Sequence, residues 1–392
     1  MKVVMVTSHP IQYQVPVFRH LAKMEGLEFS VLFAMLPDAV AQGSGFGVEF
    51  EWDVPMREGF DFQVLENVAR APSVSRFSGC DTPGIANVLK AMMPDAVIVN
   101  GWVAKTCLQA LWACKRLGIP CIVRGEANNL RQRPVWKRWL QGLLVRQYSA
   151  CLYIGEENRA FYRSLGVTEE NLVPALYCVE NERFETGASL MQGKRNEIRA
   201  QWNIDPAATC YLFCGKFEKK KHPLELTLAF SKAHHRVEGM HLLMVGDGEL
   251  RSKCEAEVSS QGLPVTFAGF LNQSEIIGAY VAADCLVLPS DAGETWGLVV
   301  NEAMACGLPA IVSDLVGCAS DLIVSGTTGD VFGFGDWDGL SDLLERYAEA
   351  KDSLGNMGKG ARMHIQRYSP LMAARGFRAA ASKVVRRKAV MR

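Results

Sequence analysis

Short runs of apolar residues alternate along the chain with longer stretches in which apolar positions recur at helical spacing. In the first half these runs occupy residues 3–6, 29–34, 96–100, 120–125 and 151–155. Runs this short and this apolar are typical of parallel strands that are buried on both faces, and the intervening stretches are long enough for crossover helices. The first half therefore predicts a doubly wound α/β domain.

The same pattern starts again after residue 184. The runs of the second half occupy residues 210–215, 241–248, 265–270, 284–290 and 309–314. They predict a second Rossmann-like parallel sheet, with a hinge near 177–184, and hence an N-terminal domain 1–180 and a C-terminal domain 181–368. Two such domains facing one another leave a central cleft, where open α/β sheets tend to bind ligands.

Composition agrees with a two-domain enzyme. The 392 residues exceed what one core usually serves, and 49% hydrophobic with 21% charged residues excludes a disordered chain. Lysine plus arginine equals aspartate plus glutamate at 42 each, so the overall charge gives no indication of a nucleic-acid partner.

The twelve cysteines are scattered without metal-binding spacing, and we expect them to be small core residues in a reducing cytoplasm. The opening apolar run is too short for a signal peptide, and no apolar segment is long enough to span a bilayer. The sequence predicts a cytoplasmic protein that could contact the inner face of the cytoplasmic membrane.

One predicted helix, within 134–148, combines tryptophan, leucine and basic residues. Its apolar positions at helical spacing are Trp136, Trp139, Leu140, Leu143 and Leu144. The favoured interpretation is a helix packed in the core with a solvated basic side. The alternative is peripheral contact with an anionic membrane surface.

The stretch "ETWGLVVNEAMACGLP" (294–309) places Glu294 before a predicted helix and Glu302 inside it. A strand-to-helix junction at 294–298 presents unpaired backbone N–H groups that suit a diphosphate. Two carboxylates suit two pairs of vicinal hydroxyls, one on a ribose and one on a hexose. The alternative is that Glu294 is a solvated loop residue and Glu302 a helix former.

Beyond this stretch, "GKFEKKKHP", "LLMVGDGEL", "VTFAGFL", "YVAADCLVLPS" and "SGTTGDVF" follow in order. Together these motifs resemble the retaining nucleotide-sugar glycosyltransferases of family 4, which have the GT-B fold. The resemblance is strong across residues 175–335. It implies that Glu302 holds the ribose hydroxyls and that Glu294 contacts the donor sugar. It also implies that the helix after Tyr368, within 369–392, crosses back to the first domain.

The resemblance assigns further donor contacts. Lys216 and Lys221 fall where the family has a basic pair that clamps the diphosphate, although Lys216 replaces an arginine and His222 a glycine. Main-chain contacts to the diphosphate and to the nucleotide base are implied at Gly215, Gly269, Phe270, Leu271, Thr295, Trp296, Gly297 and Leu298.

The N-terminal half is less characteristic. "HPIQYQVP" resembles the start of one bacterial subset of the family, so His9 is an acceptor-side candidate; a capped loop with a satisfied histidine is the alternative. Arg124 and Glu126 stand where family members often have a histidine. Glu126 could accept a proton from the acceptor hydroxyl, or pair with Arg124.

No metal and no cofactor are predicted; the donor would be a UDP-, GDP- or ADP-sugar. The "DWD" at 336–338 looks like a metal-binding motif, but its place before a helix favours an N-cap. "GDGEL" lacks the third glycine of a dinucleotide fingerprint.

The predicted function is retaining transfer of a sugar to an acceptor hydroxyl of a glycan or lipid-linked molecule, in bacterial cell-surface glycan assembly. Two alternatives remain: a nucleotide-sugar epimerase of the same fold, and a non-catalytic nucleotide-sugar-binding scaffold.

Overall fold

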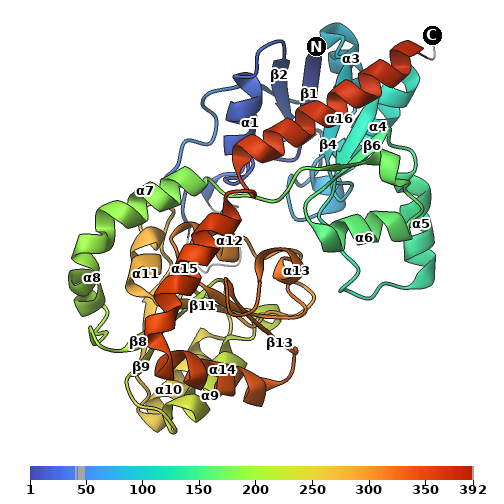
Figure 1. Ribbon diagram of the computed structural model, residues 1–392. Coiled ribbons are helices and arrows are strands. Elements are labelled where there is room, and N and C mark those ends of the chain that lie inside the picture. Colours follow the sequence, from blue (N-terminus) through green and yellow to red (C-terminus); the bar gives the residue numbers. More distant parts are fainter. Residues whose placement is uncertain (40–41, 43–48, 391–392) are drawn as a thin grey trace. The chain divides into compact units, whose positions relative to one another are not determined.

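A computed structural model describes residues 1–39, 42 and 49–390, which form two compact units (Figure 1). Unit 1 comprises Met1–Gln42, Pro55–Val179 and Tyr368–Arg392, and unit 2 comprises Gly43–Val54 and Glu180–Arg367. The C-terminal segment after Arg367 therefore belongs to the same unit as the N-terminus, whereas the short stretch before Pro55 belongs to unit 2.

Unit 1 is built on a seven-stranded parallel sheet in the order β3-β2-β1-β4-β5-β6-β7. The strands are β1 (Lys2–Thr7), β2 (Glu28–Phe33), β3 (Asp61–Val64), β4 (Ala96–Asn100), β5 (Cys121–Arg124), β6 (Ala150–Tyr153) and β7 (Leu172–Pro174). In the centre of the sheet Val3 lies opposite Phe29 on one side and Ala96 on the other. The order reverses between β1 and β4, which is the arrangement of a doubly wound sheet.

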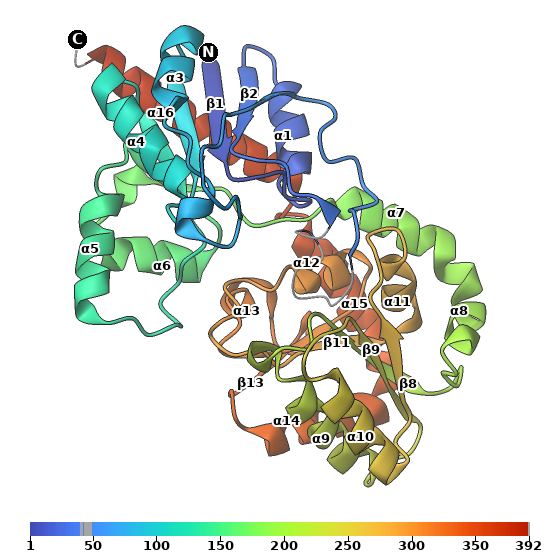
Figure 2. The same cartoon turned by 180° about the vertical axis from the view of Figure 1, so that it is seen from behind.

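Helices cover both faces of this sheet. They are α1 (Val15–Ala22), α3 (Ile85–Met92), α4 (Lys105–Leu117), α5 (Val135–Val145), α6 (Glu156–Ser164) and α16 (Pro370–Val390), with short 3-10 turns η1 (Phe77–Gly79) and η2 (Glu169–Asn171). Figure 2 shows α3 and α4 on the opposite face of the sheet from α16. Alternate side chains of each buried strand consequently enter two separate cores.

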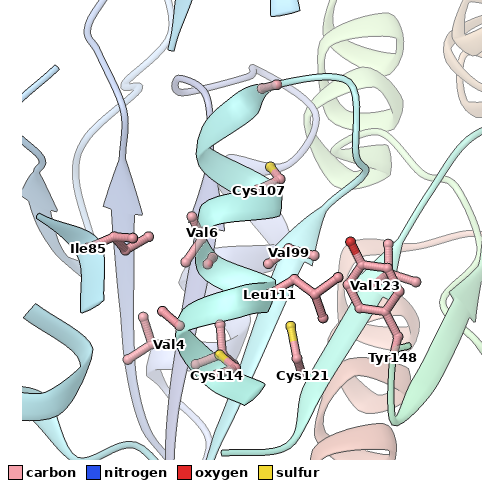
Figure 3. Close-up of a cluster of buried hydrophobic side chains, with 14 of the residues drawn as sticks. Val4, Val6, Ile85, Val99, Cys107, Leu111, Cys114, Cys121, Val123 and Tyr148 are labelled. Carbon is pink, nitrogen blue, oxygen red and sulfur yellow. The ribbon is translucent and has the colours of Figure 1, made fainter. Parts of the chain in front are cut away.

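The core under α4 holds several of the cysteines (Figure 3). Cys107 and Leu111 of α4 point toward Val6 and Val99, on β1 and β4. Burial raises the pKa of the Cys107 thiol to about 12, so the thiol stays protonated and behaves as a small apolar group. Eleven of the twelve cysteines are buried and the twelfth is partly buried, which confirms that they are core residues.

The contact of α16 with β7 depends on a glycine. A Cβ atom on Gly376 would lie 1.9 Å from the Pro174 carbonyl oxygen, which cannot move away without disturbing the strand. We expect Gly376→Ala to lower the free energy of unfolding by about 2 kcal/mol or more.

Chemical denaturation measures this loss of stability, with Gly355→Ala as the matched control. Gly355 lies within α15 and nothing approaches its Cβ position within 4 Å, so that substitution should stabilise by up to ~1 kcal/mol. Equal effects of the two substitutions would contradict the prediction.

Unit 2 is built on a six-stranded parallel sheet in the order β10-β9-β8-β11-β12-β13. The strands are β8 (Thr209–Cys214), β9 (Met240–Val245), β10 (Val265–Gly269), β11 (Cys285–Leu288), β12 (Ala310–Ser313) and β13 (Gly329–Phe332). The helices are α7 (Asn181–Met191), α8 (Arg195–Gln201), α9 (Pro223–His234), α10 (Arg251–Gln261), α11 (Ile276–Ala282), α12 (Leu298–Ala305), α13 (Ala319–Leu322), α14 (Trp337–Glu349) and α15 (Lys351–Ile365), with 3-10 turns η3 (Gln192–Lys194) and η4 (Lys219–Lys221).

The structure confirms the predicted fold class and the ten strands that apolar runs identified. The three strands that the sequence did not predict, β3, β7 and β13, all lie at sheet edges. All four residues of β3 are exposed, β7 has three residues and ends at Pro174, and β13 begins at a glycine. An edge strand needs no continuous apolar run, because at least part of its surface faces solvent.

The "DWD" stretch is a helix cap, as predicted. The Asp336 carboxylate accepts a hydrogen bond of 2.9 Å from the Gly339 N–H at the start of α14. Asp338 pairs with Lys232 of α9.

The favoured interpretation of the tryptophan-rich helix was wrong. Trp136 and Trp139 of α5 are 59% and 62% exposed, and Leu140 and Leu143 are also exposed. Only Gly142 and Val145 of this helix are buried. Periodicity identified an apolar stripe correctly, but the rest of the described part of unit 1 does not cover it.

Candidate functional site

The loops that follow β8 and β11 meet at the carboxyl edge of the unit 2 sheet. These two strands are neighbours, and the strand order reverses between them. The chain after β8 therefore leads to β9 and the chain after β11 leads to β12, so the two loops diverge at the usual ligand site of such sheets. The Asp291 N–H donates a 2.9 Å hydrogen bond to the Lys220 carbonyl and joins the two loops.

Lys221 and Glu294 form an ion pair between these two loops. Their side chains are only 11% and 14% exposed. Lys221 ends η4 in the loop after β8, and Glu294 lies in the loop after β11. Two residues that the sequence assigned to one ligand are thus brought together, and in the free protein each neutralises the other.

Helix α12 begins immediately after this loop at a glycine that the geometry requires. Gly297 has φ +103°, and a Cβ atom there would lie 2.8 Å from the Leu288 side chain. Trp296 is almost fully buried, and its indole N–H donates a 2.8 Å hydrogen bond to the Asn301 side chain. The Trp296 side chain anchors the helix start, so this residue can offer a ligand only its main chain. Thr295 is exposed, and Leu298 opens the helix.

Glu302 lies on α12 among polar side chains that the sequence did not predict. The Tyr280 hydroxyl donates a 2.6 Å hydrogen bond to its carboxylate. Burial raises the pKa of Glu302, while Tyr280, Arg183 and Gln273 act in the opposite direction. Arg183 is held in place by a 2.6 Å hydrogen bond to the Gln273 carbonyl. The carboxylate is therefore fixed in orientation rather than free in solvent.

Cys214, the last residue of β8, connects Glu302 with the lysine region. Burial, together with the charge of Glu302, raises the pKa of its thiol to about 12, whereas Lys221 acts in the opposite direction. The geometry agrees: the Lys221 side chain lies 3.5 Å from the Cβ position of the next residue, Gly215, and Tyr280, which bonds Glu302, also hydrogen-bonds the Cys214 thiol. Glu302, Lys221 and Glu294 therefore belong to one site at the end of the central strands.

Further predicted residues lie along the same edge. Gly215 donates its N–H to the Val245 carbonyl at 3.0 Å, and Gly246 donates to the Gly269 carbonyl at 2.8 Å, so the loops after β8, β9 and β10 are linked in sequence. Lys216 is partly buried, and burial lowers its pKa. Leu271, two residues beyond Gly269, is partly buried.

Phe270 contacts a segment from before Pro55, which the sequence analysis did not connect with this site. The ring of Phe50 lies 4.3 Å from that of Phe270, centroid to centroid. The Asn272 amide donates a 2.8 Å hydrogen bond to the Glu51 carbonyl. This segment thus covers the end of β10 with aromatic surface.

Two candidate residues, Glu126 and His9, belong to unit 1. Glu126 pairs with Arg124 at 2.9 Å and accepts a 2.7 Å hydrogen bond from the Tyr177 hydroxyl. Arg124 is buried, and its guanidinium lies over the Tyr177 ring at 4.5 Å. Of the two expectations for Glu126, the structure shows the ion pair with Arg124, and the Glu126 side chain remains 33% exposed.

His9 follows β1 beside the point where the unit 1 strand order reverses. Its Nδ1 lies 2.8 Å from the Ser8 hydroxyl, and burial lowers the pKa of the imidazole to about 4. The ring is neutral at pH 7, so it can accept or relay a proton but carries no positive charge.

The burial of the His9 imidazole makes the free energy of unfolding depend on pH. The unfolded chain protonates His9 near pH 6.5, whereas the folded chain does so only near pH 4. The unfolded state therefore binds more protons between these values, and stability that is complete above pH 6.5 is lost as the pH falls. We expect His9→Gln to remove up to ~2 kcal/mol of the loss between pH 7.5 and pH 5.0.

Urea unfolding of both proteins at the two pH values measures this contribution. His241, whose pKa burial also lowers to about 4, is present in both proteins, so its effect cancels. Identical losses in the wild type and His9→Gln would contradict the prediction.

Sequence reasoning missed the residues that orient Glu302. Tyr280 lies in "YVAADCLVLPS", but nothing in that pattern distinguishes a site tyrosine from a core tyrosine. Arg183 lies on α7, far from α12 along the chain, and only the tertiary fold brings them together.

Comparison with known proteins identifies relatives. Residues 194–364 match the family model described as "Glycosyl transferases group 1". A D-inositol 3-phosphate glycosyltransferase of Arthrobacter sp. (strain FB24) is 31% identical over 183 residues, which are 44% of this chain and 42% of that protein. A lipopolysaccharide 1,2-N-acetylglucosaminetransferase of Salmonella typhimurium is 26% identical over 181 residues, 44% of this chain and 45% of that protein. In each case the chain spans less than half the length of the relative.

Among solved structures, Anabaena Alr3699/HepE in complex with UDP is similar over 97% of this chain and 100% of that one, with a TM-score of 0.74 and 16% identity. At 16% identity this similarity shows a shared fold, and the shared fold extends over nearly the whole chain.

Proposed function

Residues 194–364 of this GT-B chain belong to the group 1 glycosyltransferases, and on that basis we propose that the protein is a retaining glycosyltransferase. It moves a hexosyl residue from a UDP-, GDP- or ADP-sugar to an acceptor hydroxyl. The observation that carries the proposal is the grouping of Lys221, Glu294 and Glu302 at the end of the central strands of unit 2.

In this proposal the oriented carboxylate of Glu302 accepts hydrogen bonds from the two ribose hydroxyls. Tyr280 and Arg183 favour its ionised form, which is the form that can accept both bonds. The base contacts the main chain at Gly269, Phe270 and Leu271, as the family resemblance implies. The bound nucleotide then runs from the end of β10 toward the start of α12.

The diphosphate lies against the N–H groups at 295–298, with Gly215, Lys216 and Lys221 beside it. The charge that develops on the departing diphosphate is the largest in the reaction, and preorganised cations and N–H dipoles stabilise it. This arrangement supplies the required positive charge from the chain itself. Glu294 orients the donor sugar, and no residue is proposed as a covalent nucleophile.

Unit 1, with the C-terminal helix α16, is proposed as the acceptor side. His9 is neutral and Glu126 is partly exposed, so either could receive the acceptor proton. The proposed setting is assembly of bacterial cell-surface glycans in the cytoplasm, at the inner face of the membrane, on a glycan or lipid-linked acceptor. The Salmonella relative, a lipopolysaccharide glycosyltransferase, supports this setting.

Thermal unfolding with a panel of nucleoside diphosphates and their sugars tests the donor site. At a ligand concentration of 100 Kd, a specific nucleotide should stabilise the protein by about 2.7 kcal/mol. NMR of the product formed on a simple acceptor would then establish whether the anomeric configuration is retained. Donor consumption without any acceptor would favour an epimerase, and nucleotide binding without turnover would favour a scaffold. Failure of every nucleotide to stabilise the protein would contradict the proposal.

A further inference from the structure

Helix α5 carries an apolar surface that the described part of the chain leaves uncovered. We define the α5 stripe as Val135, Trp136, Trp139, Leu140 and Leu143, which are 84%, 59%, 62%, 49% and 38% exposed. Gly142 and Val145 are the buried residues of the helix: a Cβ atom on Gly142 would lie 3.3 Å from the Leu165 carbonyl oxygen, and Val145 belongs to the core under α4. In Figures 1 and 2, α5 lies at the margin of unit 1 beside α6. Two tryptophans and three aliphatic side chains in one stripe exceed the scattered apolar exposure of an ordinary surface.

Every charged residue in the segment around α5 is basic. Residues 127–155 contain no aspartate or glutamate, and their cations are Arg131, Arg133, Lys137, Arg138 and Arg146. None of the five forms an ion pair with any residue that the structure describes. Burial, and then the charges of Arg131 and Arg138, lower the pKa of Arg133, so these three guanidinium groups lie close enough to repel one another. The cluster therefore lacks a counterion of its own.

An anionic bilayer surface would cover the apolar stripe and also neutralise the cations, whereas each other kind of partner would do only one of the two. A second copy of the chain could cover the stripe, but it would bring two uncompensated cation clusters together. A nucleic acid would neutralise the cations, but Val135, Leu140 and Leu143 offer its bases no stacking surface. Tryptophan prefers the boundary between headgroups and acyl chains, and arginine and lysine prefer the anionic headgroups above that boundary.

We propose that α5 is an interfacial helix that docks unit 1 on a bilayer containing anionic phospholipid. The α5 stripe enters the boundary between headgroups and acyl chains, and the exposed cations Arg131, Lys137, Arg138 and Arg146 contact the headgroup phosphates. No helix in the described ranges has the length and apolar character needed to span a bilayer. The attachment proposed for α5 is peripheral. The inference deepens the proposed function, since a lipid-linked acceptor would be presented at this surface. Its geometry, however, is independent of the donor site.

Vesicle binding tests the proposal with the full chain. Cosedimentation would compare large unilamellar vesicles of phosphatidylcholine with vesicles containing 30% phosphatidylglycerol. We expect at least tenfold stronger binding to the anionic vesicles at low salt, and about a tenfold loss on raising NaCl from 0.05 to 0.5 M. Lipids brominated near the headgroup should quench tryptophan fluorescence in the bound protein.

Two sets of variants separate the contributions. Trp136→Ser with Trp139→Ser should weaken binding at least tenfold and abolish most of the quenching. Trp112→Ser is the matched control, because Trp112 is 53% exposed on α4, outside the stripe. Replacing Arg131, Lys137 and Arg138 by glutamine should remove most of the preference for anionic lipid. All these side chains are exposed, so the melting temperature should hardly change.

Equal vesicle binding by the wild type and the double tryptophan variant, or no wild-type binding to anionic vesicles, would overturn the proposal. So would a concentration-dependent dimer that the double variant abolishes, because a second copy would then be the occupant. Stabilisation by nucleotides, measured on the same proteins, tests the donor site separately from membrane docking by α5. If vesicles bind but no nucleotide does, only the donor proposal fails.

Discussion

Replacing Glu302 by glutamine is expected to weaken nucleoside diphosphate binding by about 100-fold. Glutamine retains an acceptor for the Tyr280 hydroxyl, but it removes the charge and one of the two acceptor oxygens. Two charge-assisted hydrogen bonds from a ribose are each worth about 1.5–3 kcal/mol, so losing much of this energy gives the stated factor. Isothermal titration calorimetry with the preferred nucleoside diphosphate measures it.

The ribose assignment can be tested against the nucleotide as well as the protein. A 2′,3′-dideoxy nucleoside diphosphate should bind the wild type about as weakly as the normal nucleotide binds Glu302→Gln. It should show little further loss with the variant, because the two changes remove the same interaction. Tyr280→Phe is the control: it leaves the carboxylate in place and should cost only a few-fold. Additive losses from the two changes would place the ribose elsewhere.

Lys221→Met is expected to reduce sugar transfer by two to three orders of magnitude. Loss of one preorganised group that stabilises developing charge commonly has an effect of this size. The substitution should also lower the free energy of unfolding by about 3 kcal/mol, since it leaves the Glu294 carboxylate, 14% exposed, without its cation. Initial rates with the matched donor and acceptor, together with chemical denaturation, measure the two effects.

The neighbouring lysine and a double variant separate catalysis from stability. Lys220 is 42% exposed and pairs with Glu218 at 3.2 Å, so Lys220→Met should change stability by less than about 1 kcal/mol and leave most of the activity. Lys221→Met combined with Glu294→Gln should recover stability but not turnover, because the unpaired charge is gone while the diphosphate still lacks its cation. Wild-type rates in Lys221→Met would remove this lysine from the proposed mechanism.

The central strands could be predicted because burial on both faces leaves a mark in the sequence. Apart from Thr209, the strands β8 and β11 are apolar, and these apolar segments located the two loops that carry Lys221 and Glu294. The junction predicted at 294–298 likewise contains the start of α12 at Leu298. The edge strand β3 carries no such mark, since all its residues are exposed.

The surroundings of the predicted residues could not be derived in the same way. The sequence identified Trp296 as part of the helix start, but only the fold shows that its indole is buried against Asn301. The stripe of α5 was recognised from its spacing, yet spacing does not reveal whether another element covers it. The Phe50 contact with Phe270 joins residues more than two hundred positions apart, and no local pattern predicts it.

The ion pair between Lys221 and Glu294 makes donor binding an exchange of partners under the proposed roles. An intact nucleotide sugar compensates both residues at once, because its diphosphate takes the lysine and its hexose hydroxyls take the carboxylate. A nucleoside diphosphate that has lost its sugar draws the lysine away and leaves the buried carboxylate without a replacement. The ion pair between Lys221 and Glu294 therefore competes with the nucleoside diphosphate that remains after sugar transfer. This competition favours release of the nucleoside diphosphate and binding of the intact nucleotide sugar.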